Sequence, residues 1–251
     1  MTDRKKGEEE AAVSLWERLE RPAPTPRAAA LTPHRIATAA VAIADAEGLD
    51  AVTMRRLATT LGVAPMAAYR YVSGKDDVLA LMVDLVYAEL EVPAATDWRQ
   101  SMRALALNTR DLMLEHPWLA RLSEPQSVLE LTPNRMAVTE RALTALDGLG
   151  LDADTMMSVL HAVSAYTYGS THTEIAVRQL MEGQGWSTGD EVRTALAPQM
   201  MWLMNTGRYP AFLRYARGAH RKDDARWRFE TGLDYVLDGI AARMEGRPCP
   251  G

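Results

Sequence analysis

The sequence has one cysteine and no long apolar run. That cysteine, Cys249, lies in a tail rich in glycine and proline, which excludes an internal disulfide and a metal site built from cysteines. No apolar run approaches the roughly 20 residues that a membrane-spanning helix needs. The charged N-terminus shows no basic start followed by an apolar stretch, so we expect no secretory signal. These absences predict a cytoplasmic protein that does not enter a membrane.

The sequence also lacks the short motifs of several enzyme classes. It contains no glycine fingerprint for a nucleotide, no HExxH zinc motif and no GxSxG nucleophile elbow. His161 and His172 lie near Glu174 on one predicted helix, but their spacing of 11 residues is three helical turns, too far for one metal ion. We therefore expect no enzyme activity, no bound metal and no cofactor.

Charge is distributed unevenly along the chain. The formal net charge is −5, which argues against a protein that binds any polyanion regardless of sequence. Residues 27–76 nevertheless carry six Lys/Arg against four Asp/Glu, whereas residues 77–251 carry 17 against 23. A mildly basic segment on an acidic body fits a protein that touches DNA at one end only.

No segment shows the two-residue alternation of a strand, so the sequence predicts an all-α fold. Thr32 and Pro33 start the first predicted helix, which Gly48 ends. Its apolar stripe consists of Ile36, Ala40, Ile43 and Ala44. Further helices are predicted over residues 53–62, 65–71, from 73 or 74 onward, and over 97–115, 117–122, 133–149, 152–182, 191–206 and 223–245, with a glycine-rich interruption at 183–190.

The chain is expected to form two folded domains between two short ends. Residues 1–30 hold three prolines within RPAPTPRAAA and predict a flexible arm, although residues 14–20 could form a helical turn or two. Arg27, with Arg21, could meet phosphate or the minor groove, and a solvated tail is the alternative. The DNA-binding domain is predicted at 31–76, a second helical domain at 77–246, and a tail at 247–251.

Residues 53–75 predict a helix-turn-helix. Thr53 caps a short helix that Gly62 ends, and a second short helix follows. The pair is expected to pack through Leu57, Ala58, Leu61, Val63 and Ala68. The second helix then presents its exposed side to the major groove of DNA. This segment argues against the alternative of a structural or chaperone-like protein that binds only protein.

Residues 31–79 resemble the TetR family of bacterial repressors. The resemblance rests on LTPHRIATAAVAIADAEGLDAVTMRRLATTLGV and YRYVSGKDDVL. Residues 97–120 and 229–244 are similar to the ligand-binding domain of the tetracycline-repressor branch. The resemblance implies an N-terminal three-helix DNA-binding domain followed by a helical ligand-binding and dimerisation domain. It further implies a homodimer that binds a palindromic operator in double-stranded DNA and responds to a small molecule, most simply as a repressor.

The resemblance also implies which residues touch DNA. Thr53, Tyr69, Tyr71 and Lys75 should hold phosphates, and Arg55 should approach a base. Three positions that usually read bases are Pro65, Met66 and Ala67, whose side chains cannot donate hydrogen bonds, and Ala64 stands where a polar cap is usual. Base readout therefore falls on Arg55 and Arg70, although Arg70 could equally hold the backbone. The sequence predicts few base hydrogen bonds and more dependence on DNA shape.

The second domain is expected to hold the dimer interface and an effector site. The helices at 152–182 and 223–245 could form a four-helix bundle between two copies, or fill the core of one chain. The 14 methionines fit either a core or an adaptable pocket. Polar groups among apolar ones are better evidence of a pocket, although such a histidine is often only a core residue. The predicted effector contacts are Asn108, Met113, Trp118, Met157, His161, Ser164, Tyr168 and His172.

The tetracycline-repressor resemblance does not extend to that branch's metal site. Those repressors hold a drug-bound magnesium through a histidine that follows the helix ending here near Glu115. Ser123 stands at that position, and His116 is out of register. The expected effector is therefore a small, largely apolar or aromatic molecule whose identity the sequence does not specify.

Overall fold

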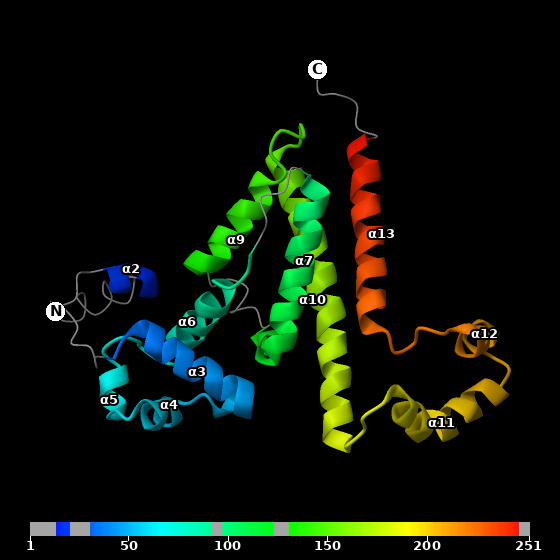
Figure 1. Cartoon of the computed structure of the whole chain (residues 1–251), viewed down its shortest axis with the longest axis horizontal. Helices are drawn as coiled ribbons and strands as arrows, with labels where there is room; N and C mark the ends of the chain where they lie inside the picture. The colour runs from blue at the N-terminus through cyan, green and yellow to red at the C-terminus, as the bar shows by residue number, and fades with distance from the viewer. Residues whose placement is uncertain (1–13, 21–30, 92–96, 123–130, 246–251) are drawn as a thin grey trace, which may run out of the picture. The chain divides into compact units, whose positions relative to one another are not determined.

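The computed structural model describes residues 14–20, 31–91, 97–122 and 131–245, without the side chain of Pro65 (Figure 1). Every regular element in these ranges is a helix, as the sequence predicts. The elements are α2 (Leu15–Glu20), α3 (Pro33–Glu47), η1 (Leu49–Ala51), α4 (Met54–Leu61), α5 (Pro65–Ala68), α6 (Lys75–Tyr87), α7 (Trp98–Glu115), η2 (Pro117–Leu122), α9 (Pro133–Thr144), α10 (Ala153–Gln184), α11 (Gly189–Asn205), α12 (Pro210–Gly218) and α13 (Ala225–Glu245), where η denotes a 3-10 helix.

The chain divides into two compact units, Met1–Leu146 and Asp147–Gly251. The first unit contains the predicted DNA-binding domain together with α7, η2 and α9, which the sequence assigned to the second domain. This division is one of compactness, and the functional boundary at residue 76 stays a prediction.

In the first unit, α3 is the central helix of the DNA-binding segment. Thr32 caps it by accepting a hydrogen bond from the Arg35 backbone N–H, and Gly48 ends it with a φ of +86°, where a glycine meets no steric penalty. The predicted apolar stripe is fully buried, with Ile36 and Ala40 at 0% exposure. It packs against α4 and α6 (Figure 1).

Helix α2 is anchored to this unit rather than free. Leu15 is buried, and the Arg18 guanidinium forms an ion pair with Asp77 in the first turn of α6. Residues 14–20, for which the sequence allowed a helical turn or two within the predicted arm, thus form a short helix held by a buried leucine and an ion pair. Arg21, Arg27 and the other arm residues lie outside the described residues, as does the tail with Cys249.

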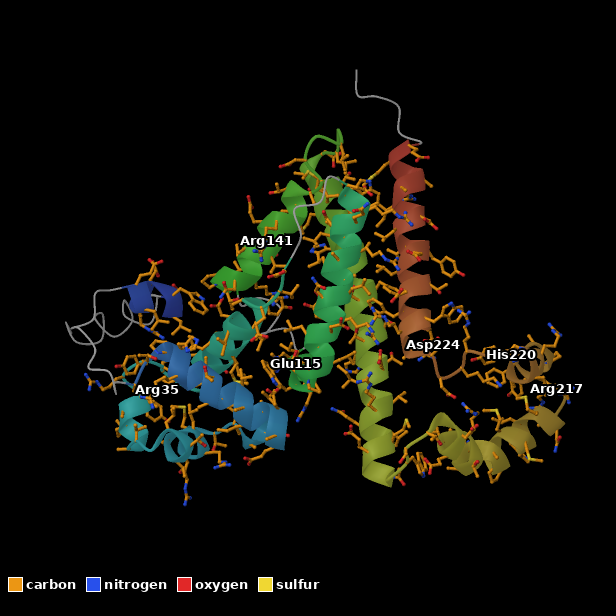
Figure 2. The ribbon with its side chains drawn as sticks, viewed as in Figure 1. Arg35, Glu115, Arg141, Arg217, His220 and Asp224 are labelled. Atoms are coloured by element: carbon orange, nitrogen blue, oxygen red, sulfur yellow. The ribbon has the colours of Figure 1, made fainter. Side chains whose placement is uncertain are left out.

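Helix α9 is hydrogen-bonded both to α6 and to the segment that follows α6. The backbone N–H of Asn134 donates to Asp84 Oδ1 at 2.7 Å, and its side-chain amide donates to Asp84 Oδ2 at 2.9 Å. Arg141 (labelled in Figure 2) donates to the carbonyl oxygen of Leu90 at 3.2 Å. These contacts fix α6, the helix that begins at the DNA-binding segment, to α9.

In the second unit, α10 and α13 lie side by side (Figure 1). Phe229, Leu233 and Leu237 form the buried stripe of α13, and Val236, Ile240 and Met244 on the same helix are half-buried. Tyr166 packs its ring 5.5 Å from the Phe229 ring, centroid to centroid. This unit thus has a two-helix core.

Between α10 and α13 the chain makes an excursion through α11 and α12 (Figure 1). The sequence predicted α11 but not α12, although Pro210 at its first turn is a helix-start signal. Neither helix buries a single side chain fully. No helix in the described part of the chain is long and apolar enough to cross a membrane.

Candidate DNA-binding surface and effector site

The helix-turn-helix has the geometry that its capping residues predict. Thr53 Oγ1 accepts a hydrogen bond of 3.1 Å from the Arg56 backbone N–H and starts α4. Gly62 is left-handed, with φ 67° and ψ 32°, and the Val63 N–H turns back to the carbonyl oxygen of Ala58 at 3.0 Å. The chain therefore reverses sharply between α4 and α5.

The inner and outer sides of the pair differ clearly. Leu57, Ala58 and Ala68 are buried, whereas Leu61 and Val63, which the sequence also placed inside, are half-buried. On the outer side Met66 is 73% exposed and Tyr69 is 45% exposed. Both side chains are thus free to contact a partner.

Most of the predicted base and phosphate contacts are exposed. Thr53, Arg55, Arg70 and Lys75 are exposed, and Ala67 and Tyr71 are half-buried. Pro65 begins α5, and its side chain lies outside the described residues. Helix α5 ends at Ala68, so Tyr69, Arg70 and Tyr71 follow it in a turn rather than extending the helix as the sequence predicted. DNA contact by each residue stays a prediction.

Arg56, next to the predicted base reader Arg55, has an internal partner. Its Nη2 donates to Glu47 Oε1 at the end of α3. This hydrogen bond, more than the opposite charge, holds the pKa of Glu47 below its ordinary value and raises the pKa of Arg56. Arg56 therefore braces α4 against α3, a role that local sequence gave no sign of.

The start of α6 carries charge of both signs. Lys75 opens the helix and is followed by Asp76 and Asp77. Asp77 Oδ2 accepts hydrogen bonds of 2.7 Å from both the backbone N–H and the hydroxyl of Ser73, in addition to its ion pair with Arg18. These two carboxylates oppose an anion at the helix start, so the Lys75 side chain must carry any phosphate contact there.

Three predicted effector contacts belong to the first unit. The Asn108 side chain donates a hydrogen bond of 2.6 Å to the carbonyl oxygen of Glu91. Met113 and Trp118 are buried, with exposures of 2% and 3%. The Trp118 indole N–H donates to Asp45 Oδ1 at 2.8 Å. The side-chain N–H groups of Asn108 and Trp118 are thus already engaged within the unit.

The other five predicted contacts lie along α10 in the second unit. His161 and His172 are exposed, and Met157, Ser164 and Tyr168 are half-buried. The effector site as a whole stays a prediction. A groove of about 600 Å³ lies elsewhere in this unit, between the first turns of α10 and the last turns of α13, and none of the eight predicted residues lines it.

One residue that links distant parts of the first unit, Asp45, was not singled out from the sequence. Asp45 on α3 accepts hydrogen bonds from Trp118 and from Nδ1 of His116, the latter at 2.8 Å. His116 and Trp118 stand 71 and 73 residues after Asp45 in the chain, so no local pattern could reveal these contacts.

The chain matches two protein families over most of its length. Residues 36–82 match "Bacterial regulatory proteins, tetR family", and residues 92–244 match "Tetracyclin repressor-like, C-terminal domain". The first match covers the helix-turn-helix, and the second covers the helices that follow α6. They are independent of the geometry described above and agree with it.

Similar proteins include a repressor and solved structures from streptomycetes. The HTH-type transcriptional repressor DrrR1 of Streptomyces coeruleorubidus is 33% identical over 94% of this chain and 87% of its own length. Apo ActR of Streptomyces coelicolor superimposes with a TM-score of 0.70 at 28% identity, covering 89% of this chain and 99% of ActR. ActR in complex with actinorhodin gives 0.67 at 29%, covering 84% and 96%. The chain therefore belongs to the TetR family of bacterial transcriptional regulators and is a ligand-responsive DNA-binding protein rather than an enzyme.

Proposed function

We propose that the chain is a cytoplasmic repressor that binds a palindromic operator as a homodimer and is released by a small, largely apolar or aromatic effector. The proposal rests on the exposed side chains of α4, α5 and the turn after α5. There an exposed methionine, an exposed tyrosine and two exposed arginines lie on the two short helices and the turn after them, on either side of a sharp glycine turn. A helix-turn-helix presents this surface to the major groove.

Recognition divides between the two kinds of side chain on this surface. Arg55 and Arg70 supply guanidinium forks that match the acceptor edge of guanine, and Met66 and Ala67 supply apolar contact for thymine methyl groups. Thr53, Tyr69, Tyr71 and Lys75 supply donors for phosphate oxygens. Few base hydrogen bonds are available from this set, so part of the specificity comes from DNA shape.

Dimerisation is supported by the apolar surface of the second unit. Tyr235 on α13 is 72% exposed and Trp202 on α11 is 68% exposed. Monomeric proteins seldom leave so many large apolar side chains in water. In a four-helix bundle of α10 and α13 from two chains, a second copy would cover those on α10 and α13, and we propose that α11 and α12 also lie against it. From α10 to α13 the exposed set is Val177, Leu180, Leu196, Met201, Trp202, Tyr209, Phe212, Tyr215, Trp227 and Tyr235.

The effector class rests on one observation. ActR, to which this chain is similar, was solved with actinorhodin bound, which supports an aromatic ligand for this chain as well. Effector contacts are proposed from Asn108, Met113 and Trp118 on the first unit, and from Met157, His161, Ser164, Tyr168 and His172 on α10.

Release is proposed to act through the spacing of the two α5 turns. Half-sites of a palindrome lie one helical turn apart, about 34–36 Å. Helix α6 begins at Lys75, directly after the DNA-binding turn, and α9 holds its other end. A shift of α6 on effector binding would change the half-site spacing and lower DNA affinity.

Selection of random duplex DNA against the purified full-length chain tests the proposal. The expected result is an enriched palindrome with two half-sites. Failure to enrich any motif, with and without a panel of aromatic compounds led by actinorhodin, would contradict it. Once the palindrome is known, an effector that lowers the affinity for DNA by a given factor must bind the free protein more tightly than the DNA complex by that same factor.

A further inference from the structure

Segment η2 and the end of α7 meet the DNA-binding helices at a polar junction, where the buried rings of His116 and Trp118 contact the partly exposed Asp45. Asp45 Oδ1 accepts from the Trp118 indole N–H and contacts Nδ1 of His116, both at 2.8 Å. A carboxylate oxygen only accepts, so Nδ1 of His116 carries the hydrogen. The two rings lie 5.9 Å apart, tilted by 54°, and Trp118 is buried. One oxygen on α3 thus binds two rings from the α7–η2 corner.

The junction lies at the joint between two helices. His116 ends α7, with its backbone N–H bonded to the carbonyl oxygen of Leu112 at 2.9 Å, and its own carbonyl accepts from Leu119 in η2 at 3.0 Å. Glu115, the residue before it, marks this end of α7 in Figure 2. Any change in the direction of α7 relative to η2 therefore moves the His116 ring, and with it the contact to Asp45.

From Asp45 the connection continues to the DNA-binding surface. Asp45 is on the last turn of α3, two residues before Glu47, which binds Arg56 on α4. Arg56 is the neighbour of Arg55, the proposed base reader. The end of α3 is therefore held on one side by His116 and Trp118 and holds α4 on the other.

The junction is also held at a cost. Nε2 of His116 is buried and has no hydrogen-bond partner in the described part of the chain, while the side chain as a whole is 8% exposed. With its hydrogen on Nδ1, this ring leaves a buried acceptor unsatisfied, which opposes the contact. A contact that is opposed in this way can open more easily than a fully satisfied one.

We propose that His116 and Trp118 are positioning residues for DNA recognition, which set the placement of α3 and α4 through Asp45. This link is separate from α6. It connects the α7–η2 corner to the DNA-binding surface through α3. It rests on the proposed function, since it describes how the same DNA-binding surface is controlled. Because linkage between two sites is reciprocal, DNA bound at α4 must also stabilise the α7–η2 corner.

Hydrogen exchange of the full-length chain, free and bound to the selected palindrome, tests the link. In the free protein, His116→Ala should speed amide exchange over residues 49–57 by about tenfold, within the range of coupling between sites. In the wild type, DNA should slow exchange over residues 112–122 as well as over 54–71. In His116→Ala, DNA should no longer slow exchange over residues 112–122 but should still slow it over 54–71. A variant that is only less stable would not separate the two effects.

Three variants make the outcome decisive. His116→Asn keeps a donor at the Nδ1 position and should behave as the wild type. Arg121→Ala removes the exposed ion pair between η2 and Asp50, whose nitrogen and oxygen lie 3.0 Å apart, and should change little. Asp45→Ala, at a partly exposed position, repeats the test if His116→Ala does not fold.

Two results would overturn the link. One is unchanged exchange over residues 49–57 in both His116→Ala and Asp45→Ala, which needs no DNA. The other is DNA that slows residues 54–71 but leaves residues 112–122 unaffected in the wild type. Failure to select any palindrome would instead count against the proposed function, and the free-protein measurement would still decide on the link.

Discussion

Tyr166 on α10 occupies the space beside Gly232 on α13. Its hydroxyl donates a hydrogen bond of 2.8 Å to the carbonyl oxygen of Phe229, and a Cβ built on Gly232 would lie 2.2 Å from that hydroxyl oxygen. Any larger residue at this point would have to displace the Tyr166 ring from its hydrogen bond to Phe229, so glycine suits this close approach of the two helices. This close approach positions the pair of helices through which we propose that the dimer forms.

Replacement of Gly232 by alanine should destabilise the protein by about 1–3 kcal/mol, because the added methyl group overpacks the contact with Tyr166. Gly239, on the same helix, has nothing within 4 Å of an added Cβ, so Gly239→Ala is the matched control. It should stabilise the protein by about 0.5–1 kcal/mol through helix propensity. Urea unfolding measures both, and equal effects of the two substitutions would refute the packing argument.

Replacement of Arg55 by alanine should relax the preference at one base pair in each half-site, by about 1–3 kcal/mol. Lys75→Ala is the contrasting variant, because a phosphate contact carries no sequence information. This variant should bind all duplexes more weakly by the same factor. The slope of log K against log salt concentration should become shallower by about 1. Titration of a panel of single-base operator variants separates the two. An unchanged base preference in Arg55→Ala would exclude Arg55 as a base reader.

Replacement of Trp202 by aspartate should weaken the dimer, because this exposed indole is proposed to lie against the second copy. Gln199→Asp introduces the same charge at an exposed position of the same helix and serves as the control. Sedimentation equilibrium should show a dissociation constant raised at least roughly tenfold for Trp202→Asp only, about 1.4 kcal/mol. If both variants remain equally dimeric, α11 does not contribute to the interface.

Acid should loosen the start of α11. Arg193 donates hydrogen bonds to Asp223 at 2.6 and 2.8 Å and to Asp190 at 2.7 Å. The hydrogen bond from Arg193 chiefly lowers the pKa of Asp223. A carboxyl with a lowered folded-state pKa stabilises the fold above its unfolded pKa, near ~3.9, and that contribution is lost as the pH falls through the folded value.

Backbone chemical shifts of residues 189–193 should therefore titrate below about pH 4 in the wild type. Asp223→Asn should remove the part of this titration that Asp223 causes and leave the part due to Glu191, whose pKa is lowered by hydrogen bonds from the backbone of Ser187 and Thr188. Glu182→Gln, at an exposed position of α10, should leave the whole titration intact. Because the ion pair is exposed, its effect on global stability should be small. A wild-type titration curve in Asp223→Asn would assign the effect to another carboxyl.

Local signals predicted most of the helix boundaries. Thr32, Thr53, Gly48 and Gly62 each act within one helical turn, and the structure confirms all four as caps or helix ends. The family and the all-α class follow from the same residues and are also confirmed. What local signals miss are contacts between distant segments. Asp45 with His116 and Arg18 with Asp77 are separated by 71 and 59 residues, and no periodic pattern marks them.

The effector site is less predictable for a related reason. A pocket is made by side chains from separate elements, and its polar members look the same in sequence as core residues. Trp118 illustrates this, because its indole N–H is used internally by Asp45. Helix α12 was missed because its nine residues carry only a short amphipathic pattern.

The most direct test of the account is the stoichiometry and affinity of the full-length chain on the selected operator. A duplex with both half-sites should bind two chains, and a duplex with one half-site scrambled should bind at least roughly a hundredfold more weakly, since each lost base contact costs about 1–3 kcal/mol. Binding of one chain per duplex with equal affinity for both DNAs would contradict a dimeric repressor that reads a palindrome.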